Sequence, residues 1–320
     1  MSNSSLLDVR VARRNLVAED ICALELERPS GGALPPFEPG AHIDVHLDGL
    51  VRQYSLLNHP SERFKYKIAV LRAIDSRGGS IKVHERLNEG QCFKISAPRN
   101  HFQLQPSPFA LLIAGGIGIT PLMAMSAELA AAGSRFALHY CARSRSRMAF
   151  AEELLGAPFS SSVSLHLDDE AGTKFDCRAV LSEAPDGAHL YVCGPRGFMK
   201  HVLDTARDLG WGEDRVHFEH FQPVAAPDNS KEAAFEILAA RTGKRVTVAA
   251  TETALSALAR IGIVVPTSCE QGVCGTCLTG VLEGVPDHRD MFLTPEERTL
   301  NNQFLPCCSR ACSDSLTLDL

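Results

Sequence analysis

The sequence has 320 residues, of which 45% are hydrophobic and 22% are charged. These proportions are those of a soluble globular protein, and they exclude a disordered chain, a collagen-like repeat and a disulfide-stapled miniprotein. The 32 basic and 38 acidic residues give a formal net charge of −6, which argues against a protein that binds nucleic acid.

Residues 1–105 read as short strands separated by turns. Apolar and polar residues alternate over 43–47 and again over 64–70, and glycine and proline pairs stand between such segments. Short strands at this spacing predict an antiparallel β-barrel. We expect one helix in this part of the chain, over residues 80–87.

Residues 106–224 show alternating strand and helix patterns in place of short strands alone. The continuous apolar run 110–114 is typical of a buried parallel strand, and it is followed by a glycine-rich turn, a helix over 121–132 and a strand over 136–140. A strand over 189–193 and a helix over 198–208 repeat the pattern. This alternation predicts a doubly wound α/β domain.

The last third of the chain begins after a change of composition. Residues 222–231 contain two prolines and few large apolar side chains, so we place an interdomain linker over 225–231. Beyond it, residues 234–238 and 245–248 predict the two strands of a β-hairpin, and residues 254–261 predict a helix. We expect residues 232–320 to form a third domain.

Two short motifs in the first domain could bind a phosphorylated cofactor. Arg52, Gln53, Tyr54 and Ser55 follow a strand, and they combine a cation for a phosphate, an aromatic ring and a hydroxyl group. Gly78, Gly79 and Ser80 open a helix, whose free backbone amides can bind an anion. An ordinary strand and an ordinary helix cap are the alternatives.

The second domain carries a glycine-rich turn between a buried strand and a helix. Its glycines would let the backbone approach a pyrophosphate, whose charge the helix N-terminus favours. The turn departs from the dinucleotide-binding pattern G-x-G-x-x-G because Pro121 replaces the last glycine, and proline is tolerated in a first helical turn. A second motif follows the strand at 189–193. The residues concerned are Gly115, Gly116, Gly118, Thr120 and Pro121 in the turn, and Cys193, Gly194 and Pro195 in the second motif.

Eleven cysteines are the unusual feature of the composition. An odd number does not suit a fully paired extracellular framework, and the sequence shows no secretory signal and no apolar stretch of about 20 residues. We therefore expect a cytoplasmic protein without a membrane partner, in which clustered thiols serve metal or redox chemistry. Six cysteines fall between residues 269 and 312.

The spacing of four cysteines near the C-terminus is that of a plant-type [2Fe–2S] cluster. Cys269, Cys274 and Cys277 follow C-x4-C-x2-C, and Cys307 follows after 29 intervening residues. A zinc site is the alternative, but zinc loops favour paired C-x2-C knuckles and only one is present. Cys308 competes with Cys307 as the fourth ligand.

Residues 269–277 (CEQGVCGTC), together with 283–284, 287–290 and 307–310, resemble the phthalate dioxygenase reductase family, and the resemblance extends over essentially the whole chain. It implies an FMN-binding barrel, an NAD(P)-binding α/β domain and a β-grasp ferredoxin domain. It places FMN on the Arg52 to Ser55 motif, on Gly78 to Ser80 and against Phe221, which could equally be a domain-interface core residue. It places the nicotinamide nucleotide on the glycine-rich turn, on Arg143 and on Cys193 to Pro195. Ser55 and Cys193 would stand at the site of hydride transfer.

Nucleotide choice is less settled by the residues. Some family members have an acidic residue just after the arginine that corresponds to Arg143, and here Ser144 stands there. The resemblance favours NADH, whereas three arginines within 143–147 keep NADPH open. Nothing in the residues themselves distinguishes FMN from FAD.

The resemblance implies a monomeric reductase that passes electrons from NADH through FMN and the [2Fe–2S] cluster to the Rieske centre of an oxygenase, an aromatic-ring dioxygenase or an O-demethylase. The alternatives are a stand-alone NAD(P)H:acceptor oxidoreductase and a non-catalytic iron–sulfur sensor. We expect no general acid or base, and among the histidines only His288, near the cysteines, stands out.

Overall fold

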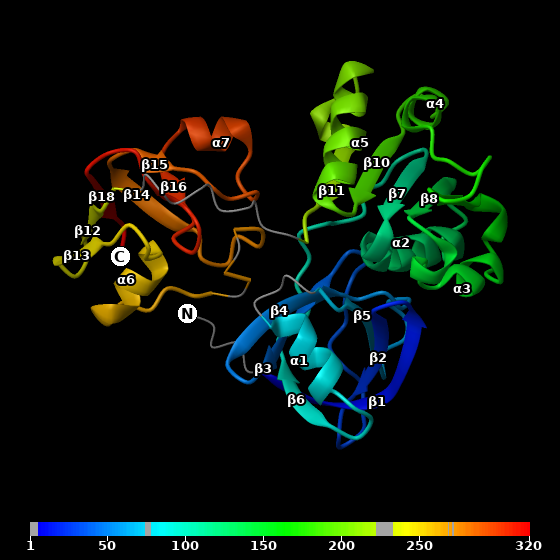
Figure 1. The fold of residues 1–320 in the computed structure, drawn as a ribbon, viewed down its shortest axis with the longest axis horizontal. Helices are drawn as coiled ribbons and strands as arrows, with labels where there is room; N and C mark the ends of the chain where they lie inside the picture. The colour runs from blue at the N-terminus through cyan, green and yellow to red at the C-terminus, as the bar shows by residue number, and fades with distance from the viewer. Residues whose placement is uncertain (1–5, 74–77, 222–232, 268, 271) are drawn as a thin grey trace. The chain divides into compact units, whose positions relative to one another are not determined.

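The structure is a computed structural model that describes residues 6–73, 78–221, 233–267, 269–270 and 272–320. The chain divides into two compact units, residues 1–221 and 222–320, and the ribbon of each can be followed in Figure 1. The linker predicted over 225–231 lies outside the described residues. No helix among those described is long and apolar enough to span a membrane.

The first unit begins with a six-stranded antiparallel sheet in the order β4-β3-β6-β1-β2-β5. Its edge strands β4 and β5 contact each other, which closes the sheet as a barrel and confirms the predicted architecture. Alternate residues of its strands, such as Val9, Val11, Ile43 and Val45, are buried in one core. The elements are β1 (Leu7–Ala18), β2 (Ile21–Glu27), β3 (His42–Leu47), β4 (Leu50–Ser55), β5 (Tyr66–Leu71), α1 (Gly79–Arg86) and β6 (Cys92–Ile95).

The rest of the first unit is a five-stranded parallel sheet in the order β11-β10-β7-β8-β9. The strands are β7 (Ala110–Gly115), β8 (Phe136–Ala142), β9 (Val163–Leu167), β10 (His189–Cys193) and β11 (Val216–Glu219). The helices are α2 (Ile119–Ala131), α3 (Ala151–Leu155), α4 (Cys177–Ser182) and α5 (Arg196–Asp208). Short 3-10 turns are η1 (Gly116–Gly118), η2 (Arg145–Arg147), η3 (Ser160–Ser162) and η4 (Glu213–Arg215).

Every residue of β7 is buried because helices cover both faces of the sheet. Leu112 and Ala114 belong to the cluster that includes α2, while Leu111 and Ile113 belong to the cluster that includes α4 and α5. The doubly wound prediction is therefore confirmed. The α2 cluster also takes in Ile21, Leu57 and Ala69 from the barrel, so the two sheets share a core.

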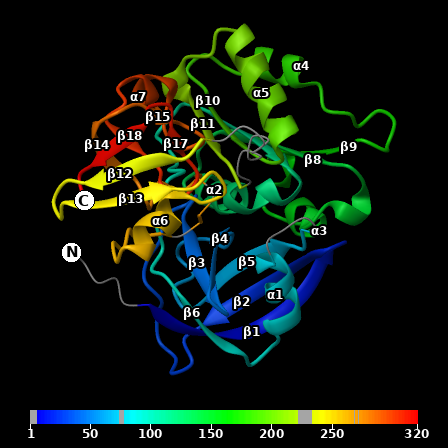
Figure 2. The ribbon, with the colours of Figure 1, turned by 60° about the vertical axis from the view of Figure 1, so that its left-hand side comes forward.

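The second unit contains a five-stranded mixed sheet in the order β13-β12-β18-β14-β16. Its first two strands form the predicted antiparallel pair, seen in yellow in Figure 2, and α6 packs with them in one core. A sheet that holds a helix in this way is the expected β-grasp arrangement. The elements are β12 (Phe235–Ala239), β13 (Lys244–Val248), α6 (Ala254–Arg260), β14 (Thr279–Glu283), β15 (Pro286–Asp287), α7 (Pro295–Thr299), β16 (Gln303–Phe304), β17 (Arg310–Ala311) and β18 (Ser315–Leu318).

Candidate functional site

The glycine-rich turn and the second nucleotide motif meet at the carboxyl end of the parallel sheet. Strands β7 and β10 are neighbours, and Ala114 pairs with Cys193. A Cβ on Gly118 would lie 2.2 Å from the carbonyl oxygen of Cys193, so the two backbone segments touch at a position that admits only glycine. The sequence named both motifs, and the sheet order places them side by side.

An aromatic side chain that the sequence analysis did not single out covers this junction. A Cβ on Gly115 or on Gly194 would lie within 3 Å of the Phe198 ring. Phe198 belongs to α5, two residues beyond its first residue. The hydrophobic spacing of the predicted helix marked Phe198 only as a helical residue, because its contact with Gly115, 83 positions earlier, depends on the fold.

Two helices begin beside the glycine-rich turn, as an anion site requires. The first, α2, begins at Ile119, two residues before the predicted start, because Gly116–Gly118 forms a 3-10 turn that runs directly into it. Thr120 and Pro121 are buried in the first turn of α2, where the Thr120 hydroxyl donates to the carbonyl of Ile117 at 3.1 Å. Pro195 caps the second helix, α5. Gly116 has a positive φ of 53° and open space where a Cβ would be.

Ser55 and Cys193, the two predicted catalytic residues, both approach Glu219. The hydroxyl of Ser55 donates to Glu219 Oε2 at 3.4 Å, and Cys193 is the neighbour of Glu219 across strands β10 and β11. Burial raises the pKa of Glu219 to about 8, although the hydrogen bond from Ser55 opposes the shift. Burial and the nearby Glu219 raise the pKa of the Cys193 thiol well above its ordinary value, so the thiol is protonated at neutral pH.

His42 closes the other side of this buried group. Its ring nitrogen Nδ1 lies 3.8 Å from Glu219 Oε1, and its Nε2 accepts a hydrogen bond from Gln53 at 3.1 Å. Burial, followed by the charges of Arg99 and His101, lowers the pKa of His42 to about 4. His42 and Glu219 are thus both uncharged at neutral pH, and their contact is not an ion pair.

Neither His42 nor Glu219 was predicted as a site residue. His42 directly precedes the alternating segment 43–47, and Glu219 lies two residues before Phe221, so nothing in the sequence set either residue apart. Register explains their meeting, because His42 pairs with Ser55 across β3 and β4. The expectation that no general acid or base is needed rested on motifs alone, and it stays a prediction. The structure places the ionisable carboxyl of Glu219 beside Ser55 and Cys193.

The remaining residues of the barrel motif divide between the two sides of β4. Gln53 and Ser55 alternate with Arg52 and Tyr54 along the strand. The Arg52 side chain lies against Gly79, whose missing Cβ leaves room for it, and so the structure brings the predicted phosphate residues together at the start of α1. Tyr54 packs against the barrel core, and its burial raises the pKa of the phenol.

The cradle at α1 has the features that a phosphate-bearing flavin needs. Gly78 takes a left-handed φ of 86° and has open space around its Cα, so backbone amides can face a ligand there. The Ser80 hydroxyl already accepts a hydrogen bond from the Ala73 amide at 3.1 Å, and its own proton can be donated to a ligand. A guanidinium, a helix N-terminus and a partly buried aromatic ring fit FMN.

Two predicted residues lie apart from these contacts. Phe221 is partly buried and packs against the hydrophobic cluster that the two sheets share. This position fits the second interpretation of Phe221, a core residue at the domain interface. Arg143 directly follows β8 and is exposed. The roles of both in cofactor binding stay predictions.

The four predicted metal ligands are all buried in the second unit, and the side chain of each contacts that of another of the four. The side chains of Cys269 and Cys274 hydrogen-bond each other, which lowers the pKa of Cys274 to about 5, and the Cys277 and Cys307 side chains also hydrogen-bond. None of these residues forms a disulfide. Among the residues that the structure describes, no three potential ligands gather around one point as a single ion would need. Four buried thiols at the C-x4-C-x2-C spacing with a distant fourth cysteine are the ligand set of a plant-type [2Fe–2S] cluster.

The loop around the four thiols depends on glycine. Gly272 and Gly275 have φ values of 74° and 68°, and a Cβ on Gly275 would strike the ring of Phe292 at 2.2 Å. Cys308 is only partly buried, and its thiol lies beside Gly272. The contact of Cys307 with Cys277 favours Cys307 as the fourth ligand.

His288 lies near this loop, beside the buried Asp290. Its Nδ1 is 3.7 Å from Asp290 Oδ1, and neither ring nitrogen has a hydrogen-bond partner among the described residues. Asp290 accepts hydrogen bonds from the amides of Phe292 and Leu293, and so it holds the segment that covers Gly275.

The chain is similar to known proteins in two of its parts and over its whole length. Residues 112–204 match the oxidoreductase NAD-binding domain and residues 238–312 match the 2Fe-2S iron-sulfur cluster binding domain. The chain is 50% identical to a vanillate O-demethylase oxidoreductase of Pseudomonas sp. (strain HR199 / DSM 7063), over 98% of this chain and 100% of the relative. It is 40% identical to the phthalate dioxygenase reductase of Burkholderia cepacia, over 98% and 97% of the two chains. The crystal structure titled phthalate dioxygenase reductase, described as a modular structure for electron transfer from pyridine nucleotides to [2Fe-2S], matches with a TM-score of 0.78 at 37% identity, over 99% and 98% of the two chains.

Proposed function

Because this chain belongs to the phthalate dioxygenase reductase family, we propose that it is the NADH-dependent reductase component of a Rieske-type oxygenase system. The observation that carries the proposal is that one chain contains candidate sites for a nicotinamide nucleotide, a flavin and an iron–sulfur cluster. Relatives named as an oxygenase reductase or a demethylase oxidoreductase are similar to this chain over almost its whole length. The acceptor of the electrons is the Rieske centre of the oxygenase. The reductase acts in the cytoplasm as a monomer, without nucleic acid or membrane.

The parallel sheet binds the nicotinamide nucleotide. The glycine-rich turn and the starts of α2 and α5 hold its pyrophosphate through backbone amides. Gly118 and Gly194 bring the turn against Cys193, so a nucleotide on the turn directs its nicotinamide toward the buried group of Cys193, Ser55 and Glu219. The phenyl ring of Phe198 braces the two glycine segments.

The barrel binds FMN, with Arg52 and the start of α1 at its phosphate. When bound, FMN accepts a hydride and releases electrons singly to the cluster. Ser55 Oγ presents a hydroxyl to the ring system, and Glu219 Oε2 accepts its hydrogen bond. Because Glu219 is buried with a raised pKa, it can hold a proton at neutral pH close to the site of hydride transfer.

Relatives named vanillate O-demethylase oxidoreductase share 44% to 50% identity with this chain. We therefore propose an aromatic O-demethylase as the partner oxygenase. A second candidate is a stand-alone reductase that uses a quinone, which is favoured by the 40% identity to a tetrachlorobenzoquinone reductase of Sphingobium chlorophenolicum.

The proposal is tested with the purified holoprotein. We expect its visible spectrum to contain flavin and iron–sulfur bands, and NADH to bleach both under anaerobic conditions. Mixed with a vanillate O-demethylase oxygenase, NADH and vanillate, the protein should yield formaldehyde in proportion to the NADH consumed. Bleaching without product, combined with rapid reduction of a tetrachlorinated benzoquinone, would support the second candidate instead.

A further inference from the structure

Three arginines follow β8, and the structure gives them different surroundings. Arg147 donates to Glu19 Oε1 at 2.7 Å, and Arg145 forms an ion pair with Glu152. Arg143 is exposed and forms no ion pair with any described residue. Two of the three cations are therefore already neutralised by neighbours.

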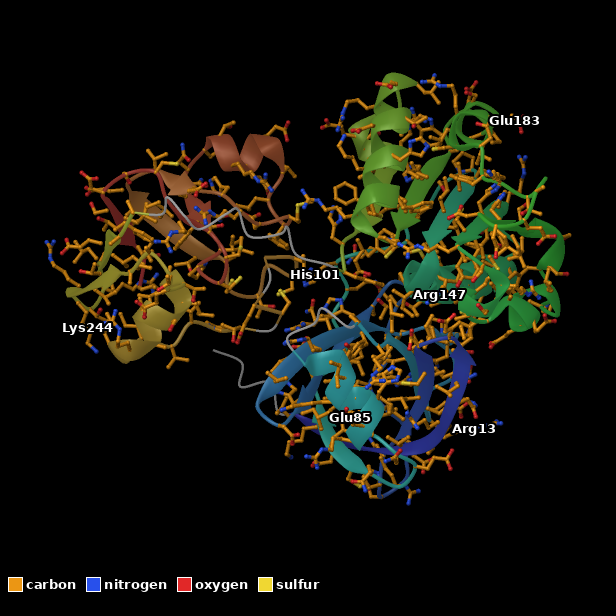
Figure 3. All side chains as sticks on the ribbon, viewed as in Figure 1. Arg13, Glu85, His101, Arg147, Glu183 and Lys244 are labelled. Carbon is orange, nitrogen blue, oxygen red and sulfur yellow. The ribbon has the colours of Figure 1, made fainter. Side chains whose placement is uncertain are left out.

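The partner of Arg147 comes from the barrel. Glu19 lies in the turn between β1 and β2, and its backbone amide donates to the carbonyl of Ser146 at 2.8 Å. The Ser146 hydroxyl donates to Glu19 Oε2 at 3.3 Å. Three contacts thus hold Glu19 on the η2 turn, although the Arg147 and Glu19 side chains are 43% and 49% exposed. Figure 3 labels Arg147 in the α/β part of the first unit.

The position of these arginines relates them to the ribose of a bound nucleotide. In doubly wound domains that bind dinucleotides, a glycine-rich turn follows one strand, and the residues after the next strand contact the adenosine ribose. An acidic residue there binds the 2′-hydroxyl of NADH, whereas an arginine binds the 2′-phosphate of NADPH. Here the glycine turn follows β7, and β8 is the next strand and its neighbour, with Gly115 paired to Cys141. Residues 143–147 therefore occupy the selective position.

We propose that Glu19 shifts the nucleotide preference toward NADH by holding Arg147 in an ion pair, so that Arg147, unlike Arg143, is withheld from a 2′-phosphate. Glu19 is a specificity-determining residue supplied by the barrel to a site on the neighbouring sheet. Some relatives have an acidic residue at the position of Ser144, and Glu19 replaces its effect on nucleotide preference. Glu19 does so by binding Arg147, and it does not contact the ribose. This inference rests on the proposed nucleotide site.

The size of the effect follows from charge. In water, a full charge about 4 Å from another changes an equilibrium constant by about fivefold. Removing the Glu19 carboxylate frees Arg147 and also removes a negative charge that repels the phosphate. We expect Glu19→Gln to raise the ratio of kcat/KM for NADPH to kcat/KM for NADH about five- to tenfold at low salt, and less at high salt because exposed charges are screened.

The experiment compares four holoproteins: wild type, Glu19→Gln, Glu19→Gln with Arg147→Gln, and Glu27→Gln as a matched control. Glu27 pairs with Arg10 across the same two strands, is similarly exposed and carries the same charge. Calorimetric binding of adenosine 2′,5′-bisphosphate and of 5′-AMP gives a second readout that does not depend on turnover. The selectivity ratio and the affinity for the bisphosphate should rise in Glu19→Gln, return to the wild-type value in the double variant and stay unchanged in Glu27→Gln.

If Glu19→Gln lowered kcat/KM for NADH and for NADPH by the same factor, the inference would be overturned. Such a result would show that Glu19 only holds the two sheets together. An increased ratio that persists in the double variant would also overturn it. A wild-type protein that neither NADH nor NADPH reduces would instead contradict the proposed function, so the two failures are distinguishable.

Discussion

The Glu219 carboxyl group has three properties: it is largely buried, it accepts a hydrogen bond from Ser55, and it lies beside a neutral histidine. Burial without a cation raises its pKa from 4.5 to about 8. The carboxyl group therefore carries a proton at neutral pH. The sequence motifs marked only Ser55 and Cys193 in this region.

The stability of the fold should report this pKa. Because the pKa of Glu219 is higher in the folded than in the unfolded chain, the group's stabilising contribution is complete below about pH 4.5 and is lost as the pH rises toward 8. We expect the free energy of unfolding of Glu219→Gln to fall less than that of wild type between about pH 5 and 8. The difference grows by at most about 1.4 kcal/mol per pH unit.

Denaturant unfolding at a series of pH values provides the measurement. Glu183→Gln is the control, since Glu183 is exposed at the end of α4 and is labelled in Figure 3. Parallel stability curves for wild type and Glu219→Gln over this pH range would show that Glu219 ionises normally.

At the scale of elements, the loop that carries three cysteines and the segment before β17 together form the candidate metal centre. Cys307 contacts Cys277, while the neighbouring Cys308 lies beside Gly272 and is partly exposed. Adjacent cysteines on this segment thus have different surroundings, although spacing alone favoured Cys307 without excluding Cys308.

Single substitutions separate the two cysteines. We expect Cys307→Ser to lose at least half of the bound iron and most of the cluster absorbance, because one iron would lack a thiolate ligand. Cys308→Ser should retain both, and it serves as the matched control. Iron and sulfide analysis of the purified variants is the measurement, and the reverse pattern would assign the fourth ligand to Cys308.

The sequence predicted the type and approximate extent of most elements because their signals are local. The strand at 189–193 and the helix that ends at Asp208 are examples, since hydrophobic period and flanking breakers define them. Contacts between distant segments were not predictable in this way. Phe198 over Gly115, His42 beside Glu219 and Glu19 on Arg147 each depend on which strands or turns become neighbours, and a single sequence carries no direct record of that.

At the scale of the whole molecule, charge is unevenly divided between the units. Residues 232–320 contain 7 basic and 11 acidic residues, so their net charge of −4 supplies most of the chain's −6. An acidic unit that carries the candidate cluster can attract a basic surface of the oxygenase through long-range electrostatics.

Electron transfer to the oxygenase should therefore slow several-fold as ionic strength rises from low salt to about 0.5 M, because salt screens attraction between exposed charges. Stopped-flow reduction of the oxygenase by the prereduced protein measures this rate. Reduction of ferricyanide, a small anion, is the comparison and should not slow in the same way. A rate that stays constant across this range would mean that docking does not depend on charge.

The hydrophobic cluster that joins Ile21, Leu57 and Ala69 of the barrel to α2 and its sheet has a consequence for how mutations spread their effects. Two sheets that share buried contacts tend to unfold as one cooperative block. A truncation such as Leu57→Ala would then loosen the nucleotide half of the chain without touching its glycine turn, whereas the second unit, with a core of its own, could tolerate independent sequence drift. Substitutions in the barrel core are thereby coupled to the neighbouring sheet, whereas substitutions in the core of the unit that carries the candidate cluster are not.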